Sequence, residues 1–227
     1  MEEKLLTLIN RDWTSPALDG LMGVMSSLNF WIIPLVIIAA ALAIYGGFRG
    51  RAVLVVLILT IIVSDSIIGN GLKHLIRRPR PSEVDADVRV VTLNLHHPIP
   101  RLLALFSPSK PALPWITVAY SRPDPDNARG RSFPSDHTLN NVCAAMVLTC
   151  FYRRFGWLFF IPAALVSYSR IYVGSHWPSD VAISIVMAAG LSLVLLALYE
   201  FLWQKFAPRL LPGVFEHHPT LWGPAAP

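Results

Sequence analysis

Five long apolar runs constrain the fold of this chain more than any other feature of its sequence. They cover residues 30–48, 51–72, 137–152, 157–172 and 181–203. A helix that crosses a bilayer needs about 20 mostly apolar residues, and these runs reach or approach that length. The composition agrees, because 54% of the residues are hydrophobic and only 15% are charged, unlike ordinary soluble proteins. We therefore expect an all-α fold, a polytopic transmembrane helical bundle.

The amino-terminal residues leave the number of spans open at five or six. Ser15 and Pro16 form a favourable helix start before a short apolar stretch, because proline suits the first helical position. A pair of interfacial helices and a sixth span both fit this segment. The chain then divides into residues 1–29, two core spans with the first motif over 30–81, a loop over 82–131, three core spans with the other motifs over 132–204, and a cytoplasmic tail over 205–227.

The 82–131 segment is polar and contains seven prolines, which exclude a long helix. Its apolar stretches, Val88 to Leu95 and Trp115 to Tyr120, indicate order against the site or the membrane surface. Long loops in compact domains are usually functional or disordered. We expect an extracytoplasmic cap that covers the pocket and helps to select the substrate.

The spans place all three motifs described below on one side of the membrane. The opposite side carries three basic pairs, Arg49 with Arg51, Arg153 with Arg154, and Lys205 with Arg209. These pairs mark the cytoplasmic side by the positive-inside rule, which long loops obey poorly. The site is therefore expected to face outward, although the motif side, with ten cations between Lys73 and Arg131, holds more than these pairs.

The net charge of +5 does not indicate a nucleic-acid partner. Ten of the nineteen lysines and arginines lie between Lys73 and Arg131, among the motif residues. Cys143 and Cys150 are seven residues apart on a predicted helix, about 10 Å between Cα atoms, which is beyond disulfide reach. We expect no nucleic-acid binding and two free thiols.

The first motif, KHLIRRPRP over residues 73–81, supplies fixed positive charge. Phosphoryl transfer depends mainly on stabilising charge on the phosphate oxygens and on positioning the reacting groups. Lys73 and Arg80 flank the end of the second span, where prolines stiffen the chain. Arg77 and Arg78 can equally belong to a juxtamembrane cluster that holds anionic lipid headgroups.

The second motif, SFPSDH over residues 132–137, precedes a long apolar run and therefore lies at a helix N-terminus. The free N–H groups and the dipole of such an end attract an anion. Ser135 is expected to cap the helix and touch phosphate, and His137 to protonate a departing oxygen. The alternative is a capped helix with no catalytic role.

The third motif, SRIYVGSHWPSD over residues 169–180, contains a histidine and a carboxylate four residues apart. One helical turn would bring Asp180 to His176, fix its tautomer and make the other ring nitrogen a nucleophile, while Arg170 adds a third cation. A metal site that includes His137 and Asp136 is the alternative. The surrounding cations would repel a divalent ion, so we expect no metal and no cofactor.

Asp65 lies inside the second span, where an ionisable group is costly and is a functional candidate. It is eight residues from Lys73, on the same helix face but too far for contact. The sequence leaves two roles open for Asp65, support of the site and pairing with a polar neighbour.

The three patterns together, Lys-x6-Arg-Pro, Pro-Ser-x-His and Ser-Arg-x5-His-x3-Asp, resemble those of the type 2 phosphatidic acid phosphatase superfamily, over roughly Asp65 to Trp203. The resemblance implies a metal-independent lipid phosphatase of a bacterial inner membrane, with its site facing the periplasm or cell exterior. Four residues would then bind phosphate: Lys73, Arg80, Ser135 and Arg170. His176 would form a phosphohistidine, Asp180 would orient it, and His137 would protonate the leaving group.

One position departs from the superfamily pattern, because Asp136 replaces the common glycine. Its negative charge is expected to weaken phosphate binding unless it points to an arginine. The Pro-Ser-Asp-His variant is similar to that of bacterial undecaprenyl pyrophosphate phosphatases of the bacitracin-resistance type. We therefore expect undecaprenyl pyrophosphate to be hydrolysed to undecaprenyl phosphate.

Other functions remain open at this point. Phosphatidylglycerophosphate, phosphatidic acid and lipid A are alternative substrates, and a lipid-binding or transport protein is the non-enzymatic alternative. The expected partners are a lipid phosphate and membrane lipids, while the oligomeric state stays undetermined.

Overall fold

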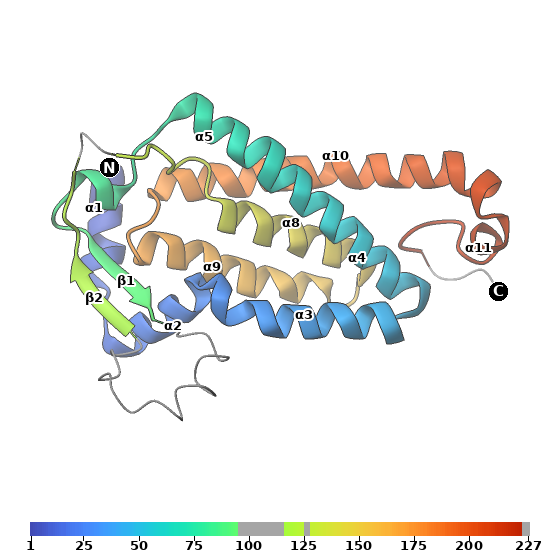
Figure 1. The fold of residues 1–227 in the computed structure, drawn as a ribbon, viewed down its shortest axis with the longest axis horizontal. Coiled ribbons are helices and arrows are strands. Elements are labelled where there is room, and N and C mark those ends of the chain that lie inside the picture. Colours follow the sequence, from blue (N-terminus) through green and yellow to red (C-terminus); the bar gives the residue numbers. More distant parts are fainter. Residues whose placement is uncertain (95–115, 125–127, 224–227) are drawn as a thin grey trace, which may run out of the picture.

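The computed structural model describes residues 1–94, 116–124 and 128–223. Its long helices run side by side, with the amino-terminal helices and a small sheet at one end and α11 (Pro212–His217) at the other (Figure 1). Three segments are long and apolar enough to cross a membrane: Leu28–Tyr45, Gly47–Val84 and Pro178–Leu210. They correspond to the first, second and fifth apolar runs of the sequence, although the first run extends three residues beyond Tyr45.

The other two runs form shorter helices. Helix α8 (Asp136–Phe151) has 16 residues, and α9 (Phe160–Tyr172), which follows a 3-10 turn over Gly156–Phe159, has 13. The chain is therefore mostly helical, as expected, and the number of spans stays a prediction.

Helix α8 lies at the centre of the bundle, where it packs against α4 (Gly47–Ile62), α9 and α10 (Pro178–Leu210). Small side chains line part of this packing, including Ala145, Ala163 and Ala188, each at most 2% exposed. Small residues allow helix backbones to approach closely in a membrane. Helix α3 (Leu28–Tyr45) packs on α4 at the outside of the bundle and has no buried residue.

The amino-terminal segment folds into short helices, α1 (Glu2–Thr7), a π-helical turn over Leu8–Asp12 and α2 (Pro16–Ser26). The Ser15 side chain accepts a hydrogen bond from the N–H of Leu18, so the predicted helix start is confirmed. The 11 residues of α2 extend about 16 Å at 1.5 Å per residue, less than the hydrocarbon core of about 30 Å. Helix α2 instead packs against α9 and the sheet.

The prediction of an all-α fold is wrong in one place. Strand β1 (Arg89–Leu93) pairs antiparallel with β2 (Ile116–Tyr120), with Arg89 opposite Tyr120. Both strands come from the apolar stretches of the 82–131 segment and are rich in β-branched residues, which favour strands. Part of the predicted cap, residues 95–115 and 125–127, lies outside the described residues, so its role stays a prediction.

The second apolar run does not continue as a regular helix. A π-helical segment (Val63–Gly69) joins α4 to α5 (Asn70–Ile76), which ends at Arg77 in the left-handed conformation, and α6 (Pro81–Val84) follows. A Cβ at Gly69 would lie 2.8 Å from Oδ1 of Asp136. The glycine therefore gives the second motif the space to approach this segment, and π-helical segments are frequent at functional sites.

Candidate active site

The three motifs meet at one end of the bundle, where α5 ends and α8 and α10 begin (Figure 1). The N–H of Ser132 donates to the carbonyl of Arg78 at 2.8 Å, which joins the first two motifs. The charges of Arg80 and Arg170 act on both His137 and His176. Residues from three distant stretches of sequence thus form one cluster.

His176 is held in a defined tautomer. Its Nδ1 lies 2.6 Å from the backbone carbonyl oxygen of Ser132. A carbonyl oxygen only accepts hydrogen bonds, so Nδ1 must carry the proton and Nε2 the lone pair. The residue is 3% exposed. The imidazole is therefore oriented with Nε2 as a potential nucleophile.

The charge state of His176 follows from its surroundings. Burial lowers its pKa well below the ordinary value, and the charges of Arg170 and Arg80 lower it further, against the opposing effect of the hydrogen bond that His176 donates to the Ser132 carbonyl. Burial disfavours the charged form, and so do neighbouring like charges. The ring is therefore neutral at pH 7, as a nucleophile requires.

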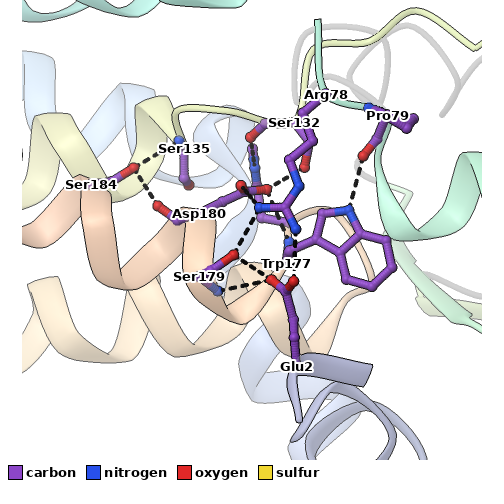
Figure 2. Close-up of polar contacts among 10 residues, drawn as sticks. Glu2, Arg78, Pro79, Ser132, Ser135, Trp177, Ser179, Asp180 and Ser184 are labelled. Atoms are coloured by element: carbon purple, nitrogen blue, oxygen red, sulfur yellow. Dashed lines mark hydrogen bonds and ion pairs between the residues drawn. The ribbon is translucent and has the colours of Figure 1, made fainter. Parts of the chain in front are cut away.

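Asp180 forms no hydrogen bond with His176, although both residues are described, so the predicted direct pairing is wrong. Its Oδ1 accepts from Arg78 at 2.6 Å, and its Oδ2 accepts from the Ser132 hydroxyl at 2.5 Å and from the Trp177 N–H at 3.2 Å (Figure 2). The carboxylate folds back onto the start of its own helix, where free N–H groups attract it. Asp180 therefore reaches His176 only through Ser132, whose carbonyl takes the orienting role.

Arg78 is a part of the site that the sequence did not identify. Its Nη1 contacts Asp180 and the Ser179 hydroxyl, and its Nη2 donates to Oε2 of Glu2 at 2.8 Å (Figure 2). The guanidinium also lies 5.4 Å from the centre of the Trp177 ring. The sequence placed Arg78 in a basic cluster for lipid headgroups, and no pattern distinguished it from Arg77.

Glu2 completes this arrangement from α1. Its Oε1 accepts from the N–H of Ser179 at 3.2 Å and from the Ser179 hydroxyl. Burial raises the pKa of Glu2, but hydrogen bonds from Ser179 and Arg78 outweigh it and lower the pKa overall. The carboxylate is thus held ionised against the first turn of α10, and nothing in the sequence connects it to the third motif.

Ser135 occupies the N-cap position of α8, but its side chain does not cap the helix, so that prediction is wrong. Its hydroxyl accepts from Thr138, and its N–H donates to the Ser184 hydroxyl at 2.9 Å. Ser184 in turn donates to the Asp180 carbonyl at 2.6 Å. These contacts fix the start of α8 against α10.

Asp136 forms a salt bridge with Lys73 and not with an arginine. Its other oxygen, Oδ1, is buried and has no hydrogen-bond partner in the described structure. The extra carboxylate therefore neutralises one of the expected phosphate-binding cations before any phosphate arrives.

Arg170 and Asp65 lie in different settings. Arg170 is 8% exposed, and its Nη1 contacts the hydroxyl of Ser26 at the end of α2. Its Nε is buried with no hydrogen-bond partner among the described residues. Asp65 is half-buried in the π-helical segment, and the neighbouring Ser64, not Asp65, contacts α8 through Asn140 at 2.8 Å. The supporting role of Asp65 stays a prediction.

Two further observations bear on the chemistry. Within the described ranges, no group of three or more histidine, cysteine or acidic side chains is arranged to hold a metal ion. An apolar pocket of about 1040 Å³ lies between α4, α10 and α11, with Phe48, Trp203 and His218 in its wall. It contains no motif residue and belongs to the opposite end of the bundle, as Figure 1 shows for α11.

Comparison with protein families gives an unambiguous result. The model of the PAP2 superfamily matches residues 52–204, about two thirds of the chain. The chain belongs to the PAP2 superfamily. The matched PAP2 region contains all three motifs and Arg78, whereas Glu2 and helices α1 to α3 lie outside it.

Individual PAP2 relatives and neighbours match less completely. The Bacillus subtilis undecaprenyl-diphosphatase BcrC is 33% identical over 109 residues, 44% of this chain and 52% of that protein. A Sulfolobus acidocaldarius undecaprenyl-diphosphatase is 40% identical over 62 residues, 27% of this chain and 30% of its own. The chain thus matches about half or less of the length of these relatives.

A solved structure extends the likeness in three dimensions. The crystal structure of Aquifex aeolicus LpxE has a TM-score of 0.58 at 24% identity and covers 86% of this chain and 94% of its own. At this identity the match shows a shared fold.

Proposed function

We propose that this PAP2 protein is an integral-membrane lipid phosphatase that works through a phosphohistidine. The observation that carries the proposal is His176, whose Nδ1 is bound to a carbonyl and whose Nε2 lies in the field of Arg80 and Arg170. A neutral imidazole with a defined free nitrogen beside fixed cations suits attack on a phosphorus atom.

In the first step Nε2 of His176 forms a bond to phosphorus, and the bond from phosphorus to the leaving oxygen breaks. Once the dianionic phosphate offsets the cations around it, His137 donates a proton to that oxygen. The side chains of Lys73, Arg80 and Arg170 stabilise the negative charge on the remaining phosphate oxygens. A phosphate dianion can also displace Asp136 from Lys73, since it offers that cation more negative charge.

In the second step water attacks the phosphohistidine, His137 takes up a proton, and the P–N bond breaks to release inorganic phosphate. The arginines and lysine supply the positive charge that a metal would otherwise give. Asp180 acts as a positioning residue, because it fixes Ser132, whose carbonyl orients His176.

The substrate we propose is undecaprenyl diphosphate, converted to the monophosphate. The names of the relatives from Bacillus subtilis and Sulfolobus acidocaldarius support this choice. We also propose that the motif end faces the periplasm or cell exterior. Arg49 donates to the Trp222 carbonyl at 3.0 Å and lies over the ring of Tyr152, which follows the last residue of α8. This basic residue therefore lies at the end of α8 opposite the motifs, and the positive-inside rule favours that end as the cytoplasmic side.

Phosphate release by the detergent-solubilised protein tests this function. The substrates are undecaprenyl diphosphate, phosphatidylglycerophosphate, phosphatidic acid and lipid A, each with a chelator present. We expect release from undecaprenyl diphosphate to be fastest and to vanish in His176→Ala. Release that requires a divalent ion, or that survives in His176→Ala, would contradict the mechanism. No release from any lipid would favour a binding or transport role.

A further inference from the structure

A second cavity, of about 320 Å³, lies beside the proposed phosphate site. Lys73, His74, Arg77, Arg129, Gly130 and Arg131 line it. Lys73 also belongs to the proposed phosphate site, so the two spaces share a wall. At roughly 30 Å³ per water the cavity has room for a hydrated phosphate group. Apart from Lys73, none of these residues has a part in the mechanism above.

The backbone of this cavity is built from two segments in close contact. Arg77 has φ 51° at the end of α5, and Gly130 has φ 60°. A Cβ at Gly130 would lie 2.7 Å from the carbonyl oxygen of Arg77, so only glycine fits. Glu83 accepts from the N–H groups of Arg80 at 2.9 Å and of Arg129 at 3.3 Å. The cavity is thus held in a fixed position relative to Arg80.

Within the described residues the arginines of the cavity have no carboxylate partner, although Lys73 is paired with Asp136. Among the described residues no carboxylate forms a salt bridge with Arg77, Arg129 or Arg131, whereas Arg78 and Arg89 are paired. The Nε of Arg77 donates to the His74 carbonyl at 3.2 Å, which uses one of the five donors of its guanidinium. A concave wall of like charges attracts an anion.

A helix C-terminus attracts cations, and this explains Lys73 and His74 near the end of α5. It does not explain Arg129 and Arg131, which arrive from a separate segment. Their convergence on Lys73 forms a positively charged wall that suits a ligand with more negative charge than one helix end provides.

We propose that this cavity binds the lipid-linked phosphate of a diphosphate substrate, the phosphate that departs with the leaving group. The inference rests on the proposed function and deepens it. One oxygen bridges the two phosphorus atoms of a diphosphate, so their binding sites must adjoin, and the shared Lys73 provides that. When His176 bonds to the terminal phosphorus, the bond to the bridging oxygen breaks and its electron pair stays on the lipid monophosphate. The cavity arginines stabilise that developing charge, and a monophosphate substrate leaves the cavity unused.

The test compares kcat/KM for undecaprenyl diphosphate and for phosphatidic acid, a lipid monophosphate, in neutral detergent. We expect Arg129→Gln and Arg77→Gln each to lower the diphosphate value about 10- to 100-fold, as loss of a charged hydrogen bond does. The phosphatidic acid value should change less than about 3-fold. Arg122→Gln is the control, since Arg122 is exposed in the same segment but outside the cavity. Equal losses on both substrates, or no loss on either, would overturn the inference.

A lipid headgroup offers the same phosphate chemistry from another source. Addition of phosphatidylglycerol to the micelles distinguishes the two. If this lipid activates the wild type on both substrates, and both arginine variants lose that activation, the cavity binds headgroups and the inference is wrong. If phosphatidylglycerol does not change the ratio of kcat/KM for the diphosphate to kcat/KM for phosphatidic acid, the inference is supported.

Binding can be measured apart from turnover in the His176→Ala protein. Inorganic pyrophosphate should raise its thermal midpoint more than orthophosphate does, and Arg129→Gln should remove the difference. If the wild type releases no phosphate but pyrophosphate still raises the thermal midpoint more than orthophosphate does, only the proposed function is refuted. If the wild type is active but the two anions raise the thermal midpoint equally, only the proposed role of the cavity is refuted.

Discussion

Helices α3 and α8 are of similar length but lie in opposite environments. All 18 residues of α3 remain unburied in the bundle, whereas seven of the 16 residues of α8 are buried. The more apolar helix is the peripheral one. Lipid can solvate the α3 surface except where α3 packs on α4, whereas α8 is surrounded by protein and carries Asp136 and His137 at its start.

This difference separates two kinds of information in the sequence. Hydropathy identifies the helices that meet lipid, because lipid requires uniformly apolar surfaces. The motifs identify the centre, where polar side chains are satisfied by one another. Substitutions in the polar centre should therefore change activity, and those on α3 should change little.

Arg80→Gln should have the largest effect among the predictions that sharpen this contrast. Loss of one charge at the transition state lowers kcat/KM by about 10²- to 10³-fold. The charge of Arg80 also helps to keep the pKa of His176 below its ordinary value. Its removal stabilises the imidazolium, so the pKa rises and the acid limb of the kcat/KM profile moves to higher pH. Profiles of variant and wild type check this, and a limb shifted to lower pH would contradict it.

Asp180→Asn should come next, with a loss of about 10- to 100-fold in kcat, typical of residues that orient a reacting group. The amide can still accept from Ser132 but no longer neutralises Arg78. KM should change less than kcat, because Asp180 does not face the phosphate. Asp12→Asn, at an exposed position on the amino-terminal segment, is the control and should behave as wild type.

Glu2→Gln tests whether a segment outside the matched family region supports the centre. The change removes the charge that holds Arg78 and Ser179, and we expect kcat to fall about 3- to 10-fold, in line with a charge-assisted hydrogen bond. Glu3→Gln is the matched control, because Glu3 is exposed. Equal activity of both variants would show that α1 does not contribute.

The smallest expected effect is on the free energy of unfolding and not on activity. Val147 in α8 is 0% exposed and Val36 in α3 is 61% exposed, so the same change to alanine compares the two helices directly. Val147→Ala should lower the free energy of unfolding by about 1–2 kcal/mol through lost packing, and Val36→Ala by close to zero. Thermal unfolding in detergent measures both, and equal shifts would remove the contrast between centre and periphery.

The sequence predicted the helices and the family because these depend on local patterns. Apolar runs and short motifs are readable from one chain, and both the superfamily and the mostly helical fold are confirmed. The paired strands β1 and β2 were missed because prolines dominated that segment, although its apolar stretches were noticed.

The contacts inside the site were less predictable. The spacing of His176 and Asp180 suggested a direct pair, but the carboxylate is drawn to the first turn of its own helix and to Arg78. The roles of Glu2 and the Ser132 carbonyl could not be predicted, because a backbone carbonyl has no sequence signature and Glu2 is 177 residues from its partner Ser179. Long-range polar contacts depend on packing that no local pattern encodes.

The most direct test of the account is to trap the covalent intermediate. Protein mixed with a lipid diphosphate labelled at the terminal phosphate is quenched in alkali, where phosphohistidine survives, and the labelled peptide is identified. The account predicts an acid-labile phosphate on His176, formed with chelator present and absent from His176→Ala. Label on another residue, or turnover at full rate with no labelled protein under conditions that trap a phosphohistidine standard, would contradict it.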